Sequence, residues 1–256
     1  MCLMTQDIFF LEDETTEFLK RLPNLDASVP TCHFAILITR SRITKEVMGI
    51  KTKDTVLARK IIKPVDDWRK IALLKIFNLA VLQRYGVYTS IKDGREIAYP
   101  WFSKGIMMPI KPRNVANAAS DLAKHIIDTA MGDDKSRLAR IDTEFYSKVH
   151  SRRDNSQPKY VTVDIDNAEI YPAVRDYLTP YKLFGVHKTA RGYHCIVEFD
   201  NAKDGAGFYG KGGTWEKLRE KFGKDVELQR DGNEPVPGTY YHNSSSKEPN
   251  FVRIIE

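Results

Sequence analysis

The sequence contains only three cysteines, and no two of them are spaced as a Cys-x-x-Cys pair. It therefore encodes neither a disulfide framework nor a zinc module. No apolar run approaches the roughly 20 residues that a membrane-spanning helix requires, and the N-terminus lacks the basic start of a secretory signal. Internal repeats and low-complexity tracts are absent as well. These absences predict a soluble, cytoplasmic protein in a reducing setting, without a membrane partner.

The composition is that of an ordinary folded protein with a mild excess of positive charge. Of its 256 residues, 42% are hydrophobic, 11% are aromatic and 29% are charged. This length suits one large domain or two small ones. The 40 Lys and Arg outnumber the 34 Asp and Glu, which gives a net charge of +6. Because clustered cations attract phosphate backbones, this excess favours a polyanionic partner without requiring one.

The first half of the chain is predicted to mix strands and helices. The apolar, branched run at 32–40 predicts a buried strand. Apolar spacing predicts helices over 65–85 and 115–131, the second capped by the asparagine before it and ended by the glycine after it. Two polar stretches, 150–159 and 200–213, are expected to be linkers or mobile loops.

The second half is predicted to alternate strands with a helix. Residues 160–166 alternate with period two, so their apolar side chains share one face. A helix is expected to open at Pro172, a first-turn position that tolerates proline. Two strands, about 182–188 and 193–199, flank the connection 189–192, which has the length and the glycine of a hairpin.

Two carboxylates, Asp164 and Asp166, leave the strand at 160–166 on its other face. Period-two alternation places their Cα atoms roughly 7 Å apart. Charges this close repel unless cations lie between them, and Mg²⁺ or Mn²⁺ takes oxygen ligands while keeping positions open for substrate phosphates. Because charged residues are depleted in strands, the apolar run into this pair favours a metal site suited to nucleotides. The alternative is a solvated strand face with two acids.

The hairpin that follows gathers groups that bind phosphate. Lys188, Thr189, Arg191 and His194 lie within seven residues, with a glycine among them. Arg191 can bind a phosphate through two N–H groups, Lys188 supplies a point charge, and His194 can donate from its ring. A basic surface turn followed by a core histidine is the alternative interpretation. The position of the hairpin one crossover unit after the acidic pair favours a shared triphosphate site.

A third carboxylate is expected to complete the site, since two-metal sites usually draw ligands from more than one strand. The candidates are Asp225, Glu227 and Asp231, which share strand parity, so alternation does not choose among them. Asp231 stands beside a glycine and could instead begin a turn. Asp225 and Asp231 rank about equally, with Glu227 slightly behind.

Together these segments resemble the archaeo-eukaryotic primase superfamily, which includes small primase subunits and primase-polymerases. Residues 161–166 are similar to its hydrophobic Asp-x-Asp motif, and 191–197 to its small-x-His strand motif, with Gly192 in the small position. Residues 235–239, Pro-Val-Pro-Gly-Thr, are similar to the Pro-Gly-Ser/Thr that follows the third motif. Residues 108–114 resemble the Asn-Pro-Arg turn of primase-polymerases, although a lysine replaces its polar amide.

The resemblance covers residues 95–256 and implies an α+β fold. In this fold, an RRM-like β-sheet catalytic core packs against a second αβ module, as in primases of this superfamily. Residues 1–94 are an N-terminal αβ region without an assigned role, either separate from the core or continuous with it.

The resemblance also implies roles for the site residues. Asp164, Asp166 and one of the three later acids bind two Mg²⁺ or Mn²⁺ ions, and His194 contacts the incoming triphosphate. Lys188 and Arg191, with the Thr189 hydroxyl between them in the same hairpin, assist that contact. Arg113, beside the start of the helix at 115–131, contacts nucleotide or template.

The expected function is DNA-templated nucleotidyl transfer, by a DNA primase or primase-polymerase in DNA replication. The two ions would activate a 3′-hydroxyl and neutralise the departing pyrophosphate, so no nucleophilic side chain is expected. The expected partners are single-stranded DNA and NTPs or dNTPs. Because no zinc-binding insertion is visible, a helicase or zinc-binding module is expected in trans or in a longer parent chain. A phage- or plasmid-encoded protein acting in a host cell fits this expectation.

Two other functions stay open at this point. A non-catalytic nucleic-acid-binding RRM-like module would share the core, and a weak third carboxylate would favour it. A metal-dependent nucleotide-sugar glycosyltransferase also uses a strand-end Asp-x-Asp, but it does not explain the segment 191–194 or the Pro-Gly-Thr. A nicking replication initiator would need a His-hydrophobe-His pair, which the sequence lacks.

Overall fold

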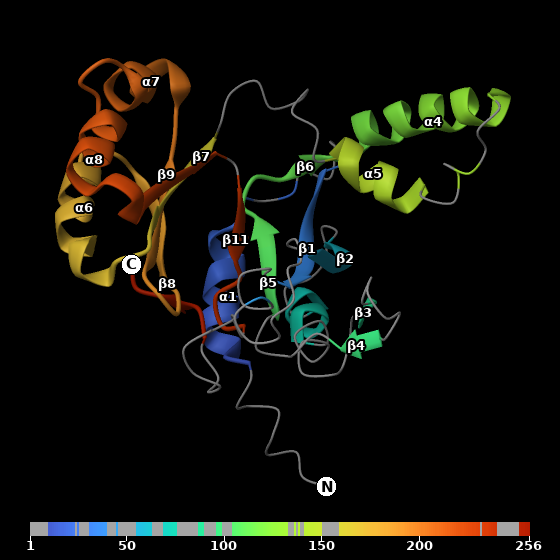
Figure 1. Ribbon diagram of the computed structural model, residues 1–256, viewed down its shortest axis with the longest axis horizontal. Coiled ribbons are helices and arrows are strands. Elements are labelled where there is room, and N and C mark those ends of the chain that lie inside the picture. The colour runs from blue at the N-terminus through green and yellow to red at the C-terminus, as the bar shows by residue number, and fades with distance from the viewer. Residues whose placement is uncertain are drawn as a thin grey trace, which may run out of the picture.

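Figure 1 shows the protein as a computed structural model. The structure describes residues 10–23, 25, 31–39, 45, 55–62, 69–75, 87–89, 96–98, 104–132, 136, 138, 141–149, 159–230, 232–239 and 251–256. Within these ranges, helices combine with antiparallel sheets, so the α+β class predicted from the sequence is confirmed. No helix in the described ranges is both long and apolar enough to cross a bilayer.

The first sheet draws its strands from both sides of residue 94. It contains β1 (Thr31–Thr39), β2 (Thr55–Ile62), β5 (Lys104–Pro109), β6 (Arg113–Asn114) and β11 (Asn233–Pro235). The order is β11-β5-β1-β2, with β6 paired to the start of β1, and every pairing is antiparallel. β1 confirms the strand predicted at 32–40. A separate pair is formed by β3 (Val87–Thr89) and β4 (Glu96–Ala98).

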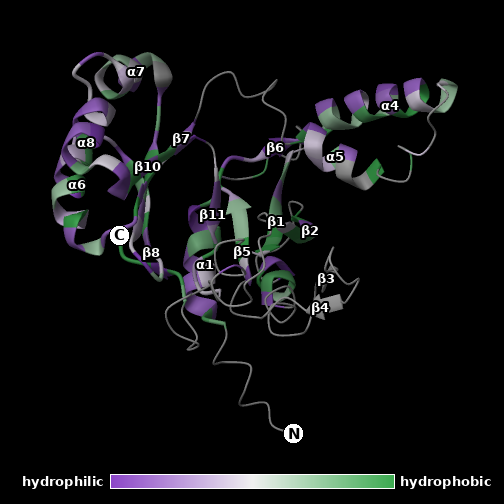
Figure 2. Cartoon of the chain, in the orientation of Figure 1, coloured by the Kyte–Doolittle hydropathy of each residue, from purple (hydrophilic) through white to green (hydrophobic). Residues whose placement is uncertain are grey.

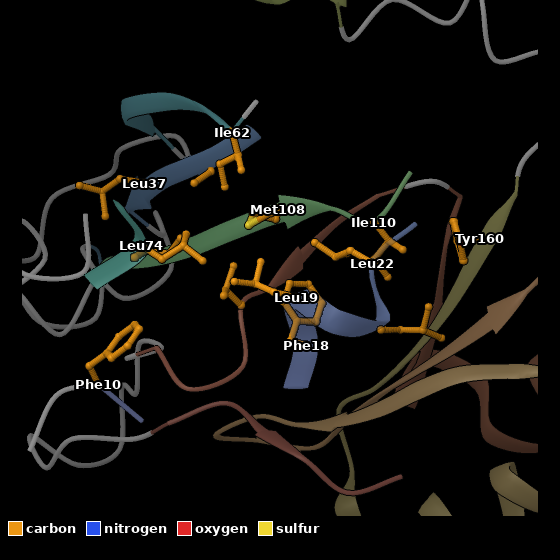
Figure 3. Packing of buried hydrophobic residues seen from close by; sticks show 14 residues of the cluster. Phe10, Phe18, Leu19, Leu22, Leu37, Ile62, Leu74, Met108, Ile110 and Tyr160 are labelled. Carbon is orange, nitrogen blue, oxygen red and sulfur yellow. The ribbon is translucent and has the colours of Figure 1, made fainter. Parts of the chain in front are cut away.

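One hydrophobic cluster joins the helix α1 (Glu12–Arg21) to both sheets. Acidic residues occupy the first turn of α1 and basic residues its last turn, which suits the helix dipole. In Figure 3, Phe18 and Leu19 of α1 lie among side chains of the first sheet, such as Met108. Tyr160, which begins the second sheet, belongs to the same cluster. Each such apolar side chain contributes about 1.5–3 kcal/mol when buried. α1 therefore holds the two sheets against each other.

Two further helices form an arm beside the first sheet. α4 (Val115–Met131) has the bounds predicted from the sequence, and the Asn114 side chain caps it by accepting from the backbone N–H groups of Ala116 and Asn117. α5 (Ile141–Val149) and the start of α4 pack on β1, where Phe34 contacts Tyr146 at a centroid distance of 5.6 Å, and the rest of α4 extends away from both sheets (Figure 1). Ile127, which the spacing places on the apolar side, is 59% exposed because this end of α4 lies far from the sheets.

The second sheet is built from the region after residue 159. Its elements follow one another as β7 (Tyr160–Ile165), α6 (Tyr171–Leu178), β8 (Leu183–Lys188), β9 (Tyr193–Glu198), α7 (Asn201–Tyr209), α8 (Thr214–Phe222) and β10 (Val226–Arg230). With β12 (Arg253–Ile254), the strands assemble in the order β10-β7-β9-β8-β12, and all pairings are antiparallel. The predicted hairpin and the helix opening near Pro172 are confirmed.

Helices cover one face of the second sheet. Val161, Val163 and Ile165 of β7 are fully buried on this helix-covered face, in a cluster with Val174 of α6 and Leu218 of α8. In Figure 2, α8 is mainly hydrophilic, as expected for a helix with only one side against a sheet, whereas β1 in the first sheet is mainly hydrophobic. The alternation predicted for β7 is thus confirmed.

The expectation of a linker or loop at 200–213 is wrong, because most of this stretch is α7. Asp200 caps the helix by accepting from the backbone N–H of Ala202, and Phe208 is fully buried against Phe199 and Tyr181. Cap and burial together outweigh the low helix propensity of its glycines. The other predicted linker, 150–159, lies outside the described residues except for its last one.

The C-terminal segment returns to α1. Gly238 has a φ of +79°, and a Cβ there would lie 2.3 Å from both the Leu11 carbonyl oxygen and the Thr15 Oγ1, so this position requires glycine. The Leu11 N–H donates to the Gly238 carbonyl at 2.8 Å, and the Thr15 hydroxyl to the Pro237 carbonyl at 2.8 Å. The Pro-Gly-Thr segment is therefore a joint between the two ends of the chain.

Candidate active site

β7 turns Asp164 away from the helix-covered face. Ile165, its neighbour, is fully buried against the helices, so alternation directs Asp164 to the opposite side of a central strand. The Asp164 side chain is 24% exposed, and Asp166 lies just beyond the strand and is exposed. We call the side of the sheet that carries Thr162, Asp164, His187 and His194 the polar face.

His194 completes a pair with Asp164 across the strands. It lies opposite Asp164 in the β7–β9 ladder, with its Nε2 3.3 Å from Asp164 Oδ1, and its side chain is only 6% exposed. Gly192 permits this approach, because a Cβ at that position would lie 1.7 Å from the Ile165 carbonyl oxygen. The loop before β9 can therefore close against the end of β7 only with glycine, which explains the small residue of the predicted motif.

Glu234 is a member of this site that the sequence did not reveal. It comes from β11 of the first sheet and is 1% exposed. Its Oε2 accepts a hydrogen bond from His194 Nδ1 at 2.8 Å, and its Oε1 accepts one from the Thr162 hydroxyl. The one signal was an acid inside the otherwise apolar Pro-rich run at 234–237. The site therefore combines residues of both sheets.

The charges around Asp164 oppose its ionisation. Burial raises the pKa of Asp164; His194 counteracts this shift, whereas the negative charges of Asp166, Glu234 and Glu227 add to it. A carboxylate in this environment gains from a nearby cation, because the cation offsets both burial and repulsion.

Glu234 shows the opposite balance. Burial by itself would raise the pKa of Glu234, but the charge of His194 and hydrogen bonds from His194 and Thr162 lower it below the ordinary value. A buried carboxylate that accepts two hydrogen bonds in this way is kept ionised. Glu234 is thus a fixed negative charge behind the imidazole.

His187 is a second residue that sequence reasoning missed. It lies directly opposite His194 in the β8–β9 ladder, and its ring contacts the edge of Phe18 at a centroid distance of 5.6 Å. Burial lowers the pKa of His187 to about 4, so it is neutral near pH 7. Neither ring nitrogen has a hydrogen-bond partner in the described part of the chain.

The three candidates for a third carboxylate differ in their positions. Glu227 lies directly opposite Asp164 in the β10–β7 ladder and is exposed. Asp225 lies before the strand, in a short 3₁₀ turn, where its backbone carbonyl accepts from the Asp166 N–H at 3.1 Å. Asp231 lies outside the described residues. Register therefore brings Glu227 beside Asp164.

The predicted phosphate-binding residues do not all lie on the polar face. The loop that holds Thr189 and Arg191 lies against the end of β7 through Gly192. Lys188 shares the side of β8 on which Val186 is buried, so alternation directs it away from the polar face. Arg113 is buried in β6 and is paired with Cys32 in the first sheet.

The donor chemistry near the end of β7 suits a hard divalent cation. Asp164, Asp166 and Glu227 offer oxygen ligands, which Mg²⁺ and Mn²⁺ prefer. As placed, no group of three or more His, Cys, Asp or Glu side chains within the described ranges is arranged to hold an ion. The fit therefore depends on the oxygen ligands and on the excess negative charge around Asp164.

Comparison of the chain with protein-family models, with curated proteins and with solved structures finds no match. The functional argument therefore depends on the geometry of the site itself.

Proposed function

We propose that the protein is a metal-dependent nucleotidyltransferase that copies a DNA template, as a primase or primase-polymerase in DNA replication. One observation carries the proposal. Three adjacent strands align Glu227, Asp164 and His194 side by side, so that two carboxylates and an imidazole share one stretch of the polar face. Carboxylates for cations beside a donor for phosphate are what phosphoryl transfer requires of a protein.

The connection of the second sheet supports this proposal. Strand, helix, two strands, helical segment and strand follow one another, with the strands ordered β10-β7-β9-β8. A β-α-β-β-α-β unit of this kind fits the RRM-like core that the primase resemblance implies. In this arrangement Asp164 and His194 occupy the two central strands.

Each residue has a proposed role. Asp164, Asp166 and Glu227 would hold Mg²⁺ or Mn²⁺, which when bound supplies charge neutralisation for the attacking hydroxyl and the departing pyrophosphate. His194, when both ring nitrogens carry a hydrogen, donates from Nε2 to an oxygen of the incoming triphosphate. Gly192 allows the preceding loop, with Arg191, to lie close enough to the end of β7 to contact the same phosphates.

The test is primer synthesis and primer extension on single-stranded DNA, with labelled NTPs or dNTPs and with Mg²⁺ or Mn²⁺. The wild type is compared with Asp164→Asn/Asp166→Asn and with Asp128→Asn, a control at an exposed position on α4. We expect products from the wild type and the control but not from the double variant. The 5′ ends of the products distinguish priming from extension.

An inactive wild type would overturn the proposal. If such a protein bound single-stranded DNA equally well with and without the double substitution, the alternative of a non-catalytic nucleic-acid-binding module would replace it.

A further inference from the structure

The contact between the two sheets places a buried carboxylate directly behind His194. Glu234 Oε2 lies 2.8 Å from His194 Nδ1, and the Thr162 hydroxyl donates to the other carboxylate oxygen. Glu234 and His194 are 1% and 6% exposed. Water therefore competes little for these bonds, and loss of either partner leaves a buried polar group unsatisfied.

The direction of these bonds fixes the imidazole. An ionised carboxylate can only accept hydrogen bonds, so Nδ1 of His194 must carry a hydrogen. The ring is then oriented with Nε2 toward Asp164, at 3.3 Å from Oδ1. A hydrogen bond to one ring nitrogen in this way determines which chemistry the other nitrogen presents.

We propose that Glu234 is a positioning residue for His194. Glu234 acts from the first sheet, across the interface, on a histidine of the second sheet. It keeps a hydrogen on Nδ1 and aims Nε2 at the phosphate-binding side of Asp164, so that the second hydrogen of the protonated ring is the one donated there. The role of the aimed nitrogen rests on the proposed nucleotidyl transfer, whereas the fixed orientation of the ring does not. Because Glu234 belongs to β11 of the first sheet, His194 is aligned only when the two sheets are docked.

The polar groups around the pair come from several elements. Thr162 and Asp164 belong to β7 and His187 to β8, and all of them lie on the polar face with His194. Glu234 is the carboxylate that bonds Nδ1, at 2.8 Å. The orientation of His194 therefore depends on a residue outside its own sheet.

The first measurement is spectroscopic and needs no activity. Long-range ¹H–¹⁵N correlation spectra report which ring nitrogen of each histidine carries hydrogen, and the His194→Phe variant identifies the His194 signals. Three variants are compared: Thr162→Val, Glu234→Gln, and the double variant Thr162→Val/Glu234→Met. The double variant replaces Thr162 and Glu234 by apolar groups of similar shape, so that His194 Nδ1 is the one group of the three that loses its partner.

The expected spectra separate positioning from packing. Thr162→Val keeps the Nδ1 signature because Glu234 remains, and Glu234→Gln keeps it because the amide oxygen still accepts. The double variant, folded as judged by circular dichroism, loses the signature. An unchanged His194 signature in the folded double variant overturns the proposal, and so does its loss in Thr162→Val alone.

The second measurement uses nucleotide incorporation. We expect the double variant to reduce kcat/KM about 10- to 100-fold, as for a misplaced catalytic group, and Glu234→Gln to restore most of it. In a His194→Phe background, the same substitutions should change kcat/KM less than twofold, about the noise of such assays. Independent losses in that background would mean that Glu234 acts through something other than His194. An inactive wild type with the expected spectra would instead count against the proposed function alone.

Discussion

The two faces of the second sheet use the same strands for opposite purposes. On the helix-covered face, Val161, Val163 and Ile165 are fully buried among apolar neighbours. One residue along the same strand, Asp164 is half-buried among acids that oppose its charge. Period-two alternation therefore separates stability from chemistry within a single strand. Substitutions on each face test whether the helix-covered face affects stability alone and the polar face affects chemistry alone.

The largest expected effect is on the helix-covered face. Val163→Asp places an unpaired charge in a fully buried position, which costs on the order of 5 kcal/mol or more and unfolds the protein. Circular dichroism and urea unfolding measure the loss. The matched control is Val56→Asp on β2, where the valine is 39% exposed and the cost is expected to stay below about 1 kcal/mol. A folded Val163→Asp protein would show that this face is not a tight core.

The next largest effect is a loss of stability at low pH, caused by His187 on the polar face. Burial lowers the pKa of His187 from its ordinary value to about 4, while Glu234 counteracts the shift and His194 and Arg21 add to it. Unfolding lets the ring bind a proton more easily, so stability is complete above pH 6.5 and falls as the pH drops toward 4, by on the order of 3 kcal/mol.

The test of this acid sensitivity is urea unfolding between pH 4 and pH 7. His187→Leu should remove this part of the decline, because the variant has no ring to protonate. Equal slopes for wild type and variant would show that other groups cause the acid sensitivity.

A smaller effect on stability is expected at the turn between β8 and β9. Gly192→Ala forces a Cβ against the Ile165 carbonyl oxygen and should cost about 1–3 kcal/mol by overpacking. In the control Gly207→Ala, the new Cβ meets only Tyr181 Oη at an ordinary 3.6 Å within α7, so stability should rise by about 0.5–1 kcal/mol. Thermal unfolding measures both. A neutral Gly192→Ala would mean that the loop can close without glycine.

The smallest effect on stability is expected at the residue most important for the proposed reaction. Asp164→Asn should change the free energy of unfolding by less than about 1 kcal/mol, since the lost pairing with His194 is offset by relief from burial and repulsion. Nucleotide incorporation should nevertheless fall at least about 100-fold, as when one electrostatic contact to a transition state is removed. Chemical denaturation together with the extension assay provides both values. A strongly destabilised Asp164→Asn would place this residue with the structural ones.

The sequence predicts the parts of the fold that depend on near neighbours. The bounds of α4 follow from apolar spacing and from an asparagine that caps within three residues, and the face of Asp164 follows from alternation along six residues of β7. The hairpin β8–β9 follows from its short connection. Each of these features is determined within one turn or one strand.

Features that depend on distant partners could not be predicted in this way. Asp225 and Glu227 have the same parity, and only the register of β10 against β7 places Glu227 opposite Asp164. Glu234 contacts His194, 40 residues away in the chain, from a different sheet, so no local period indicates it. α7 was missed because its glycines concealed a helix that burial of Phe208 stabilises.

The joint at Gly238 has a consequence for how the protein forms in the cell. Thr15 and Pro237, which share a hydrogen bond, are 222 residues apart, and the Glu14 side chain accepts from the Ile254 backbone N–H across 240 residues. Closing loops of this length carries an entropic cost, and non-local contacts of this kind slow folding. On the ribosome, α1 emerges long before residues 237–254, so these contacts form only after that segment has been made. Until then, part of its apolar side remains uncovered and is a natural target for chaperones.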